Sequence, residues 1–262
     1  MTSGPTPGPR LAARRVLVVG AGTQPSDDPE APVGNGRAIA VLAAREGASI
    51  VCADRDPAVA EETAAWIAAE GGEASVVIAD VSSAEQCASL VTEATAGGEL
   101  DGLVLNVGIG RGNGIAGTGV DDWDLTFAVN LRGHFLVVRE ALTRLSDGAA
   151  IVFVSSVAGL QPGSRLPAYD ASKAGLIGLC RHVALEGARR GVRANVVAPG
   201  LIDTPLGRWA SRGRPSRERT PVPLGRQGSA WEVATATVFL LSDDASYITG
   251  QVLAVDGGLT LI

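Results

Sequence analysis

The sequence has little positive charge. Its 262 residues include 22 Lys and Arg against 28 Asp and Glu, which gives a net charge of −6 at pH 7. Nucleic-acid binding needs a basic surface, so nucleic acid is excluded as an expected partner. Long apolar runs are also missing: Val16 to Val19 is too short for a signal sequence or for a membrane span of about 20 residues. We therefore expect a soluble, cytoplasmic protein with no membrane partner.

Cysteine, histidine and aromatic residues are scarce as well. The three cysteines, Cys52, Cys87 and Cys180, are widely spaced and odd in number, which indicates reduced, mostly buried thiols. His134 and His182 lie far apart and no metal-ligand spacing occurs, so we expect no metal site. Hydrophobic residues make up 46% of the chain but aromatic residues only 4%. The core must therefore be built from Ala, Val, Leu and Ile, which suits alternating strands and helices.

Short apolar runs alternate with segments of helical periodicity along the chain. Residues 1–13 include a Gly- and Pro-rich stretch, and we expect them to be a disordered tail in front of one domain over residues 14–262. The expected strands are 14–19, 48–53, 74–79, 100–105, 149–155, 193–198 and 252–255. The first expected helix begins near residue 36 and ends at Gly47. The later expected helices cover 57–70, 84–95, 120–145, 169–185 and 230–241. This order predicts an α/β fold.

Glycines cluster between the first strand and the first helix. Gly20 and Gly22 follow the strand, and Gly34-Asn35-Gly36 precede the helix. A strand, a glycine-rich turn and a helix start together form a cradle for phosphate, because bare backbone lets a pyrophosphate approach the positive helix end. Residues 23–33 separate the two glycine groups, and we interpret them as a surface excursion whose ends still close the turn. An ordinary strand-to-helix loop is the alternative.

Polar residues also follow the next strands. Asp54, after the second strand, is placed to accept both hydroxyls of an adenosine ribose and to repel the extra phosphate of NADP. Arg55 either pairs with that phosphate or lies across the adenine. Asp80, followed by Val81, either bonds the adenine amino group or caps the next helix. Asn130 lies within an apolar helical segment, where it needs buried hydrogen-bond partners. It either belongs to a polar network of a functional site or only satisfies polar groups of the core.

The segment from Ile151 to Lys173 contains the best candidate reactive group. Tyr169 lies four residues before Lys173, so on a helix both side chains share one face. A nearby ammonium favours the phenolate and lowers the pKa of a tyrosine from about 10 towards working pH. Such a tyrosine suits general acid/base catalysis. Ser156, after the preceding strand, would hold a substrate oxygen; alternatively, Tyr-x-x-x-Lys occurs here by chance.

Residues 201–228 lack strict periodicity and are expected to form a substrate loop. This segment is rich in arginine, and its positive charges either bind an anionic substrate or form a solvated surface. The arginines are Arg208, Arg212, Arg214, Arg217, Arg219 and Arg226. The last expected strand ends at Asp256-Gly257-Gly258.

The motifs together resemble the short-chain dehydrogenase/reductase family from Val16 to Gly258. The residues that carry the resemblance are Gly20, Gly34, Gly36, Asp80-Val81, Asn106-Val107-Gly108, Asn130, Ser156, Tyr169, Lys173, Pro199-Gly200, Thr204 and Asp256-Gly257-Gly258. This resemblance implies a single-domain Rossmann-type fold with three layers and a doubly wound, mainly parallel sheet of about seven strands. It also implies a nicotinamide cofactor. The chain departs from the family by having thirteen residues between Gly20 and Gly34, where the family has about three.

The resemblance further assigns roles to residues. Asn130, Ser156, Tyr169 and Lys173 would form a catalytic tetrad: Tyr169 moves the proton, Lys173 depresses its pKa and holds the nicotinamide ribose, Ser156 polarises the substrate oxygen, and Asn130 supports a water that relays protons. The remaining cofactor contacts would come from Gly20, Gly22, Gly34, Asn35, Gly36, Asp54, Arg55, Asp80, Val81, Asn106, Gly108, Pro199, Gly200, Ile202 and Thr204. Family members are commonly tetramers or dimers, so we expect a homo-oligomer, with a tetramer favoured.

The expected activity is NAD(H)-dependent interconversion of a secondary alcohol and a ketone. An NADPH-dependent carbonyl or 3-oxoacyl reductase is the alternative among enzymes, and Asp54 argues against it. A non-catalytic, dinucleotide-sensing protein is the alternative from another class; because the chain keeps all four tetrad residues, catalysis is favoured.

Overall fold

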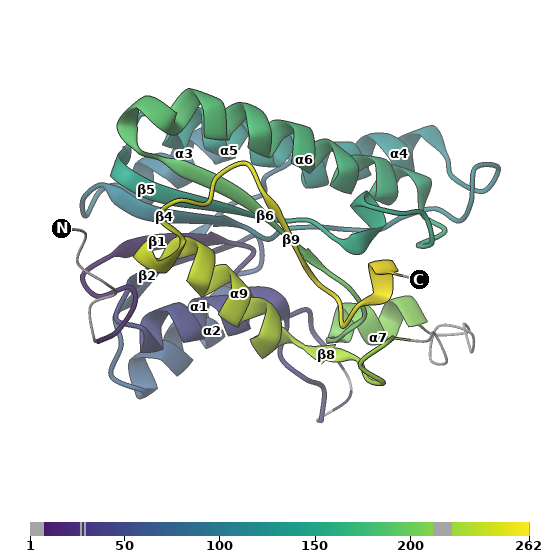
Figure 1. The fold of residues 1–262 in the computed structure, drawn as a ribbon, viewed down its shortest axis with the longest axis horizontal. Helices are drawn as coiled ribbons and strands as arrows, with labels where there is room; N and C mark the ends of the chain where they lie inside the picture. The colour runs from purple at the N-terminus through teal and green to yellow at the C-terminus, as the bar shows by residue number, and fades with distance from the viewer. Residues whose placement is uncertain (1–7, 27, 29, 212–221, 262) are drawn as a thin grey trace.

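Helices cover both faces of a central sheet in the computed structural model (Figure 1), which describes residues 8–26, 28, 30–211 and 222–261, apart from the side chains of residues 209 and 210. The seven strands are all parallel. Their order across the sheet is β3 (Ala74–Ile78), β2 (Ser49–Asp54), β1 (Arg15–Val19), β4 (Leu100–Leu105), β5 (Leu145–Val154), β6 (Arg193–Pro199) and β9 (Val252–Val255). A separate two-stranded pair consists of β7 (Ile202–Asp203) and β8 (Gly228–Ser229). The predicted single-domain α/β fold with a parallel sheet of about seven strands is confirmed.

Two helical layers enclose this sheet (Figure 1). One layer contains α3 (Ala84–Ala94), α4 (Val120–Phe127), α5 (Gly133–Ala141) and α6 (Pro167–Gly187). The other contains α1 (Asn35–Arg45), α2 (Pro57–Ala69) and α9 (Ala230–Leu241). The shorter helices are α7 (Pro205–Ser211), the π-helix η1 (Ala128–Arg132) and the 3-10 helices η2 (Val157–Gly159), η3 (Ala188–Arg190), η4 (Asp243–Ala245) and η5 (Leu259–Leu261).

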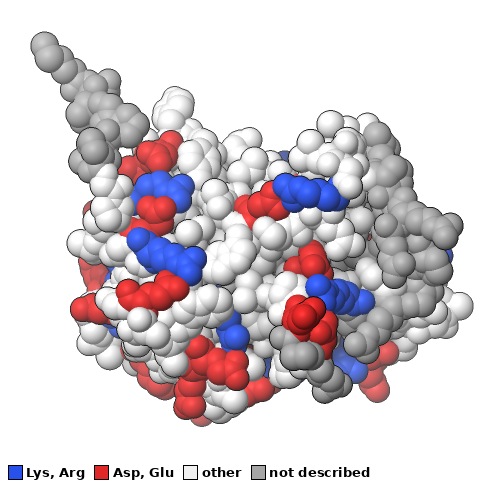
Figure 2. Space-filling view, turned by 90° about the horizontal axis from the view of Figure 1, so that it is seen from below, with Lys and Arg blue, Asp and Glu red and all other residues white. Residues whose placement is uncertain are grey.

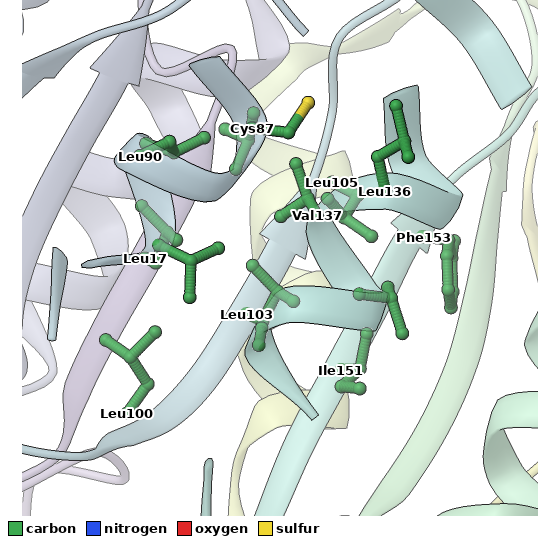
Figure 3. Close-up of a cluster of buried hydrophobic side chains, with 14 of the residues drawn as sticks. Leu17, Cys87, Leu90, Leu100, Leu103, Leu105, Leu136, Val137, Ile151 and Phe153 are labelled. Carbon is green, nitrogen blue, oxygen red and sulfur yellow. The ribbon is translucent and has the colours of Figure 1, made fainter. Parts of the chain in front are cut away.

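The strands carry near-continuous apolar sequences because both of their faces are buried. Leu17, Leu103 and Phe153 point to one face and pack with the leucines and valines of α3 and α5 (Figure 3). The alternate residues Val18 and Val104 belong to a second core against α1 and α9. This alternation follows from the two-residue repeat of a strand.

The strand order reverses between β1 and β4. The chain moves outward from β1 to β3 and then returns to place β4 on the other side of β1. The loops that follow these two strands diverge, because they lead to helices on opposite faces of the sheet. In open α/β sheets, ligands bind in the crevice at this point, outside the carboxyl ends of the strands.

The domain begins earlier than the sequence indicated. Leu11 is fully buried, and its main-chain N–H donates to Glu46 O at 2.8 Å. Arg10 forms an ion pair with the Glu46 side chain at 2.7 Å. The expectation that residues 1–13 are a disordered tail is therefore wrong for the segment around Leu11, which packs against the end of α1. Residues 1–7 lie outside the described part of the chain.

The helix expected over residues 120–145 is divided into α4, η1 and α5. The wider π-helical turn places Asn130 in its middle, and its side chain is buried. Residues 142–144 connect α5 to β5, which begins at Leu145. The strand is therefore longer than the expected 149–155, and Ser155 follows its last residue.

The face that contains α1, α2 and α9 carries acidic and basic side chains close together (Figure 2). Arg37 pairs with Glu62 at 2.6 Å and Arg45 with Glu70 at 2.7 Å. Within the described residues, no helix is both long and apolar enough to cross a bilayer. The three cysteines are buried and form no disulfide, as the sequence indicated.

Candidate active site

Two adjoining cavities open at the carboxyl ends of the strands. The larger, of about 750 Å³, extends from the glycine turn to Lys173. The smaller, of about 450 Å³, is lined by Ser156 and the segment that follows β6. Tyr169 and Thr204 line both cavities. A ligand in one cavity is therefore next to a ligand in the other.

The glycine turn brings β1 and α1 into direct contact. Gly20 has a φ of +81°, a conformation that favours glycine. A Cβ on Gly36 would lie 1.8 Å from Gly20 O, so no larger residue fits there without movement of the backbone. The Gly34 N–H donates to Thr23 Oγ1 at 2.9 Å. The ends of the 23–33 loop thus meet, as the sequence interpretation required, and the start of α1 faces the larger cavity.

Asp54 faces this turn from the end of β2. Its Oδ2 accepts the Gly22 N–H at 3.1 Å, and its Oδ1 accepts the Asp56 N–H at 3.3 Å. Arg55 lines the same cavity. The carboxylate is therefore held at the edge of the glycine turn, where an adenosine ribose would lie if a pyrophosphate occupied the start of α1.

The ends of β3 and β4 complete the larger cavity. Asp80 Oδ1 accepts the Ser82 N–H at 2.8 Å, which closes a turn before α3, whereas the N-cap of that helix is Ser83. Asp80 and Val81 line the cavity. Asn106 Nδ2 donates to Gly20 O at 2.8 Å and so fixes the glycine turn from β4.

Tyr169 and Lys173 lie one turn apart on α6, which begins with Pro167 at its first position. The Lys173 Nζ is 5.7 Å from the centre of the Tyr169 ring and donates to Val154 O at 2.9 Å. Burial lowers the pKa of Lys173 from 10.5 to about 8. A Cβ on Gly108 would lie 3.0 Å from this Nζ, so the glycine lets the β4–α4 segment close over the ammonium.

Ser156 follows β5 and caps η2, where its Oγ accepts the Ala158 N–H at 3.1 Å. Its neighbour Ser155 donates through Oγ to Lys173 O at 2.8 Å. This bond ties the end of β5 to the first half of α6. Ser156 and Tyr169 thereby reach the smaller cavity from two different elements.

Asn130 lies behind the cavities and does not line either of them. Its Nδ2 donates to Ile109 O at 2.9 Å and to Ser172 Oγ at 3.1 Å, while its Oδ1 accepts the Ile109 N–H at 2.8 Å. Ser172 in turn donates to Tyr169 O at 2.8 Å. Asn130 therefore connects the segment after β4 to the helix that carries Tyr169.

Ser172 and His134 support residues around the cavities without lining them, and the sequence interpretation missed both. His134 is fully buried, and its Nε2 lies 3.0 Å from Val107 O. Its Nδ1 has no hydrogen-bond partner among the described residues. Burial, followed by the Lys173 charge, lowers the pKa of His134 to about 3. A polar residue within the Tyr-x-x-x-Lys motif and a histidine four positions after Asn130 were the available signals, but neither indicates its partner.

The segment after β6 forms the other wall of the smaller cavity, which Pro199, Gly200, Ile202 and Thr204 line. Gly200 packs so tightly that a Cβ would lie 2.7 Å from Asp256 Cα. Thr204 Oγ1 accepts the Gly207 N–H at 3.0 Å at the start of α7. In Figure 1, α7 and the C-terminus lie at the same end of the sheet.

The predicted arginine-rich loop is only partly within the described residues. Arg208 pairs with Asp203 and Asp28, and Arg226 pairs with Glu232. These two arginines therefore belong to ion pairs rather than to an open anion site. Arg212, Arg214, Arg217 and Arg219 lie outside the described residues.

The larger cavity fits a nicotinamide dinucleotide. The close contact of Gly20 and Gly36 leaves main-chain N–H groups at the start of α1 for a pyrophosphate. Asn35, the first residue of α1, lines both cavities, and its Oδ1 is buried without a hydrogen-bond partner among the described residues. Asp54 ends β2 and Lys173 contacts Val154 at the end of β5, three strands further across the sheet, so a long ligand beside Asp54 would reach Tyr169 and Lys173.

Comparison with known proteins agrees with this geometry. A family model described as enoyl-(acyl carrier protein) reductase matches residues 32–260. The 2-(S)-hydroxypropyl-CoM dehydrogenase 3 of Xanthobacter autotrophicus is 37% identical over 238 residues, which cover 87% of this chain and 93% of that protein. The 3-oxoacyl-[acyl-carrier-protein] reductase of Thermotoga maritima is 34% identical and covers 96% of this chain and 100% of that protein.

A solved structure from Agrobacterium tumefaciens, assigned as a 2-deoxy-D-gluconate 3-dehydrogenase with NADP bound, superposes with a TM-score of 0.86. It is 34% identical, and the match covers 98% of this chain and 100% of that chain. The match includes the whole sheet and both helical layers. The chain belongs to the short-chain dehydrogenase/reductase family, whose members are oxidoreductases that use a nicotinamide dinucleotide to act on CH–OH and C=O groups.

Proposed function

We propose that the protein interconverts a secondary alcohol and a ketone with NAD(H), and that Tyr169 is the general acid/base. The observation that carries the proposal is the meeting of Ser156 and Tyr169 at the smaller cavity, with the buried Lys173 one helical turn behind the tyrosine. A hydroxyl pair on one side of a cavity can hold a substrate oxygen and exchange its proton. The cavity neighbours the proposed dinucleotide site.

Each residue of the site has its own role in the proposed reaction. A nicotinamide dinucleotide held by the glycine turn, Asp54 and Lys173 would supply the hydride acceptor for the alcohol and the hydride donor for the ketone. Tyr169 removes the hydroxyl proton during oxidation and delivers it during reduction. Ser156 holds and polarises the substrate oxygen, and Lys173 stabilises the phenolate through its positive charge and binds the nicotinamide ribose.

Asn130 acts through the elements that it connects. Its hydrogen bonds to Ile109 and Ser172 hold the β4–α4 segment against α6. We assign it the support of a proton-relaying water next to Lys173. We assign substrate binding to the segment of residues 201–228, because its residues Thr204 and Leu206 line both cavities.

Asp54 supports NAD over NADP as the cofactor. A carboxylate at the end of β2 accepts the ribose hydroxyls of NAD and repels the phosphate that NADP carries there. The second candidate is NADP, because Arg55 lines the same cavity and a solved relative holds NADP. Values of kcat/KM with NADH and NADPH decide between them: a higher value for NADPH would make the role given to Asp54 wrong.

Tyr169→Phe tests the catalytic assignment. The change removes the proton-donating hydroxyl and little volume, so turnover should be lost while the affinity for NADH, measured by fluorescence titration, stays nearly unchanged. Turnover near that of the unmodified protein would contradict the assignment. A protein that binds NADH but oxidises no alcohol in a broad panel would instead support the dinucleotide-sensing alternative.

We also infer that the protein forms a homo-oligomer, with a tetramer favoured over a dimer. Large apolar side chains are exposed on α4, α5 and the edge strand β9, including Trp123, Phe135 and Leu253. Burying such side chains between copies would remove apolar surface from water. Light scattering coupled to size-exclusion chromatography measures the state directly, and a monomeric mass would contradict the inference.

A further inference from the structure

Arg165 is the only charged residue among the described residues that line the smaller cavity. It lies in the loop between Ser156 and Tyr169. The same cavity contains these two proposed catalytic residues. Any charge on a substrate that fills the cavity would therefore face a positive charge on the wall and no negative one among these residues.

This arginine also differs from the two described arginines of the segment proposed to face the substrate. Arg208 and Arg226, which lie in the segment proposed to face the substrate, each contact a carboxylate. Arg165 forms no ion pair with any residue in the described ranges. A guanidinium without a carboxylate partner keeps its donors available for an anion from outside the chain.

The backbone at Arg165 has a φ of 65°, which lies in the left-handed region. This conformation is less favourable for a residue with a side chain than for glycine. Two contacts fix it: Gly114 N–H donates to Arg165 O at 2.8 Å, and Leu166 N–H donates to Ser164 Oγ at 2.9 Å. An arginine is thus held at a turn position that glycine would occupy without strain.

The other described residues of the cavity wall are neutral and include several aliphatic side chains. These are Val157, Leu166, Leu201, Ile202, Leu206 and Leu259. A substrate that fits this lining has an apolar body, with its reacting carbon beside Ser156 and Tyr169. Arg165 can then contact a charged group on another part of the same substrate.

We propose that Arg165 binds an anionic group of the substrate, so that the natural substrate is a hydroxy or oxo compound carrying a carboxylate, sulfonate or phosphate. Guanidinium groups bind these planar or tetrahedral anions through paired N–H donors. The inference rests on the proposed alcohol–ketone chemistry and names the substrate class of the same site. Arg165 is then a specificity residue that touches the substrate but takes no part in proton transfer.

The test compares matched ketones in the reduction direction, followed by NADH absorbance at low ionic strength. The anionic probes are 4-oxopentanoate, 3-oxobutane-1-sulfonate and 3-oxobutyl phosphate, and the neutral probe is methyl 4-oxopentanoate. The unmodified protein should prefer at least one anion over the neutral ester in kcat/KM. The preferred anion then distinguishes the three possible groups.

Arg165→Gln should lower kcat/KM for the preferred anion by about ten- to a hundredfold, mainly through KM, because one charge-assisted contact is lost. For the neutral ester it should change by less than about twofold, and Arg165→Lys should restore part of the preference. Arg189→Gln removes an equal charge from η3, at a residue that lines neither cavity. This control should leave kcat/KM unchanged for both the anion and the ester. Equal losses for anion and ester, or no preference in the unmodified protein, would overturn the proposal.

A second readout separates this inference from the proposed function. Pentanoate, butane-1-sulfonate and butyl phosphate have no ketone to reduce, and at least one of them should raise the Tm of the protein–NAD complex but not that of Arg165→Gln. Turnover of the ester without anion preference refutes only the role of Arg165. Absence of turnover for every probe refutes the proposed function, and an Arg165-dependent Tm rise would still support the anion site. If neither turnover nor a Tm rise occurs, both proposals are wrong.

Discussion

Arg208 on α7 forms an ion pair with Asp28 in the β1–α1 loop, with 2.7 Å between Nη1 and Oδ2. The same guanidinium binds Asp203 through Nε at 2.7 Å and Nη2 at 3.0 Å. The loop residues Thr23 and Gln24 line the larger cavity. Leu206, in the first turn of α7, lines the same cavity. The ion pair therefore joins two of the segments that line the proposed cofactor site.

Asp28→Asn should speed the release of the cofactor. The change keeps the size of the side chain and removes the charge that holds the loop to α7. Because the pair is exposed, the expected increase in the NADH dissociation rate is small, about two- to fivefold in low salt. The difference from the unmodified protein should shrink in 1 M salt, where exposed charges are screened. Stopped-flow NADH fluorescence measures these rates.

Glu62→Gln is the control for Asp28→Asn, because it removes the exposed carboxylate of another ion pair, with Arg37, and neither residue lines a cavity. It should leave NADH release unchanged. If both variants release NADH at the unmodified rate in low salt, the β1–α1 loop does not restrain the cofactor through this contact.

Asp54→Asn should weaken the preference for NADH over NADPH. Asparagine keeps an oxygen that can accept the Gly22 N–H, a bond of 3.1 Å in the structure, but it no longer repels the extra phosphate of NADP. We expect the ratio of the two kcat/KM values to move about tenfold or more towards NADPH, which corresponds to about 1.4 kcal/mol. If the ratio is unchanged, residues other than Asp54 determine the choice of cofactor, and Arg55 is the next residue to test.

The sequence predicted those parts of the site that depend on local spacing or on strand ends. Tyr169 and Lys173 share a helix face because they lie four residues apart, and Asp54 follows a strand that the apolar pattern already indicated. The parallel sheet then gathers the strand ends at one edge. For these residues, chain order and periodicity were sufficient.

Contacts between distant segments could not be predicted in this way. Ser172 joins Asn130 to Tyr169 O, and His134 reaches Val107 O, but both contacts depend on how η1 and α5 lie against α6 and the end of β4. Leu11 lies near a Gly- and Pro-rich stretch with no periodicity, so its burial follows only from packing beside Glu46. The sequence places Arg165 in the loop before Tyr169, but which other residues share a cavity wall with it follows only from the fold.

Gly36→Ala should disrupt the proposed cofactor cradle. The new Cβ would meet Gly20 O at 1.8 Å, so the start of α1 must move away from β1. We expect a stability loss of about 1–3 kcal/mol from the overlap and at least roughly tenfold weaker NADH binding, because the N–H groups at the helix start are displaced. Urea unfolding and fluorescence titration measure the two effects.

Gly178→Ala supplies the control on helix α6. A Cβ at Gly178 meets no atom within 4 Å, so alanine should leave NADH binding unchanged and stabilise the helix by up to about 1 kcal/mol. If Gly36→Ala binds NADH as tightly as this control variant, the close approach of Gly20 and Gly36 is not needed for the cofactor.

His134 should make the protein less stable in mild acid. Its pKa is about 3 in the folded protein, because burial and the Lys173 charge oppose protonation, and about 6.5 when unfolded. Between these values the unfolded chain binds the extra proton, so this contribution lowers the free energy of unfolding as the pH falls from 6.5 towards 3. The expected loss between pH 6.5 and pH 5 is about 2 kcal/mol.

Urea unfolding of His134→Gln across the same pH range isolates this contribution. Glutamine does not titrate, and its amide can still donate to Val107 O, so the variant should show a flatter decline below pH 6.5 whatever its stability at pH 8. His182→Gln is the matched control, because His182 is exposed on α6 and lies 3.5 Å from Glu186, and it should keep the unmodified slope. Carboxylates that titrate in acid affect all three proteins alike, so only the difference in slope reports on His134. Equal slopes for His134→Gln and the unmodified protein would show that the buried imidazole accepts a proton in the folded state as readily as in the unfolded chain, and the unpartnered Nδ1 would then have to reach water.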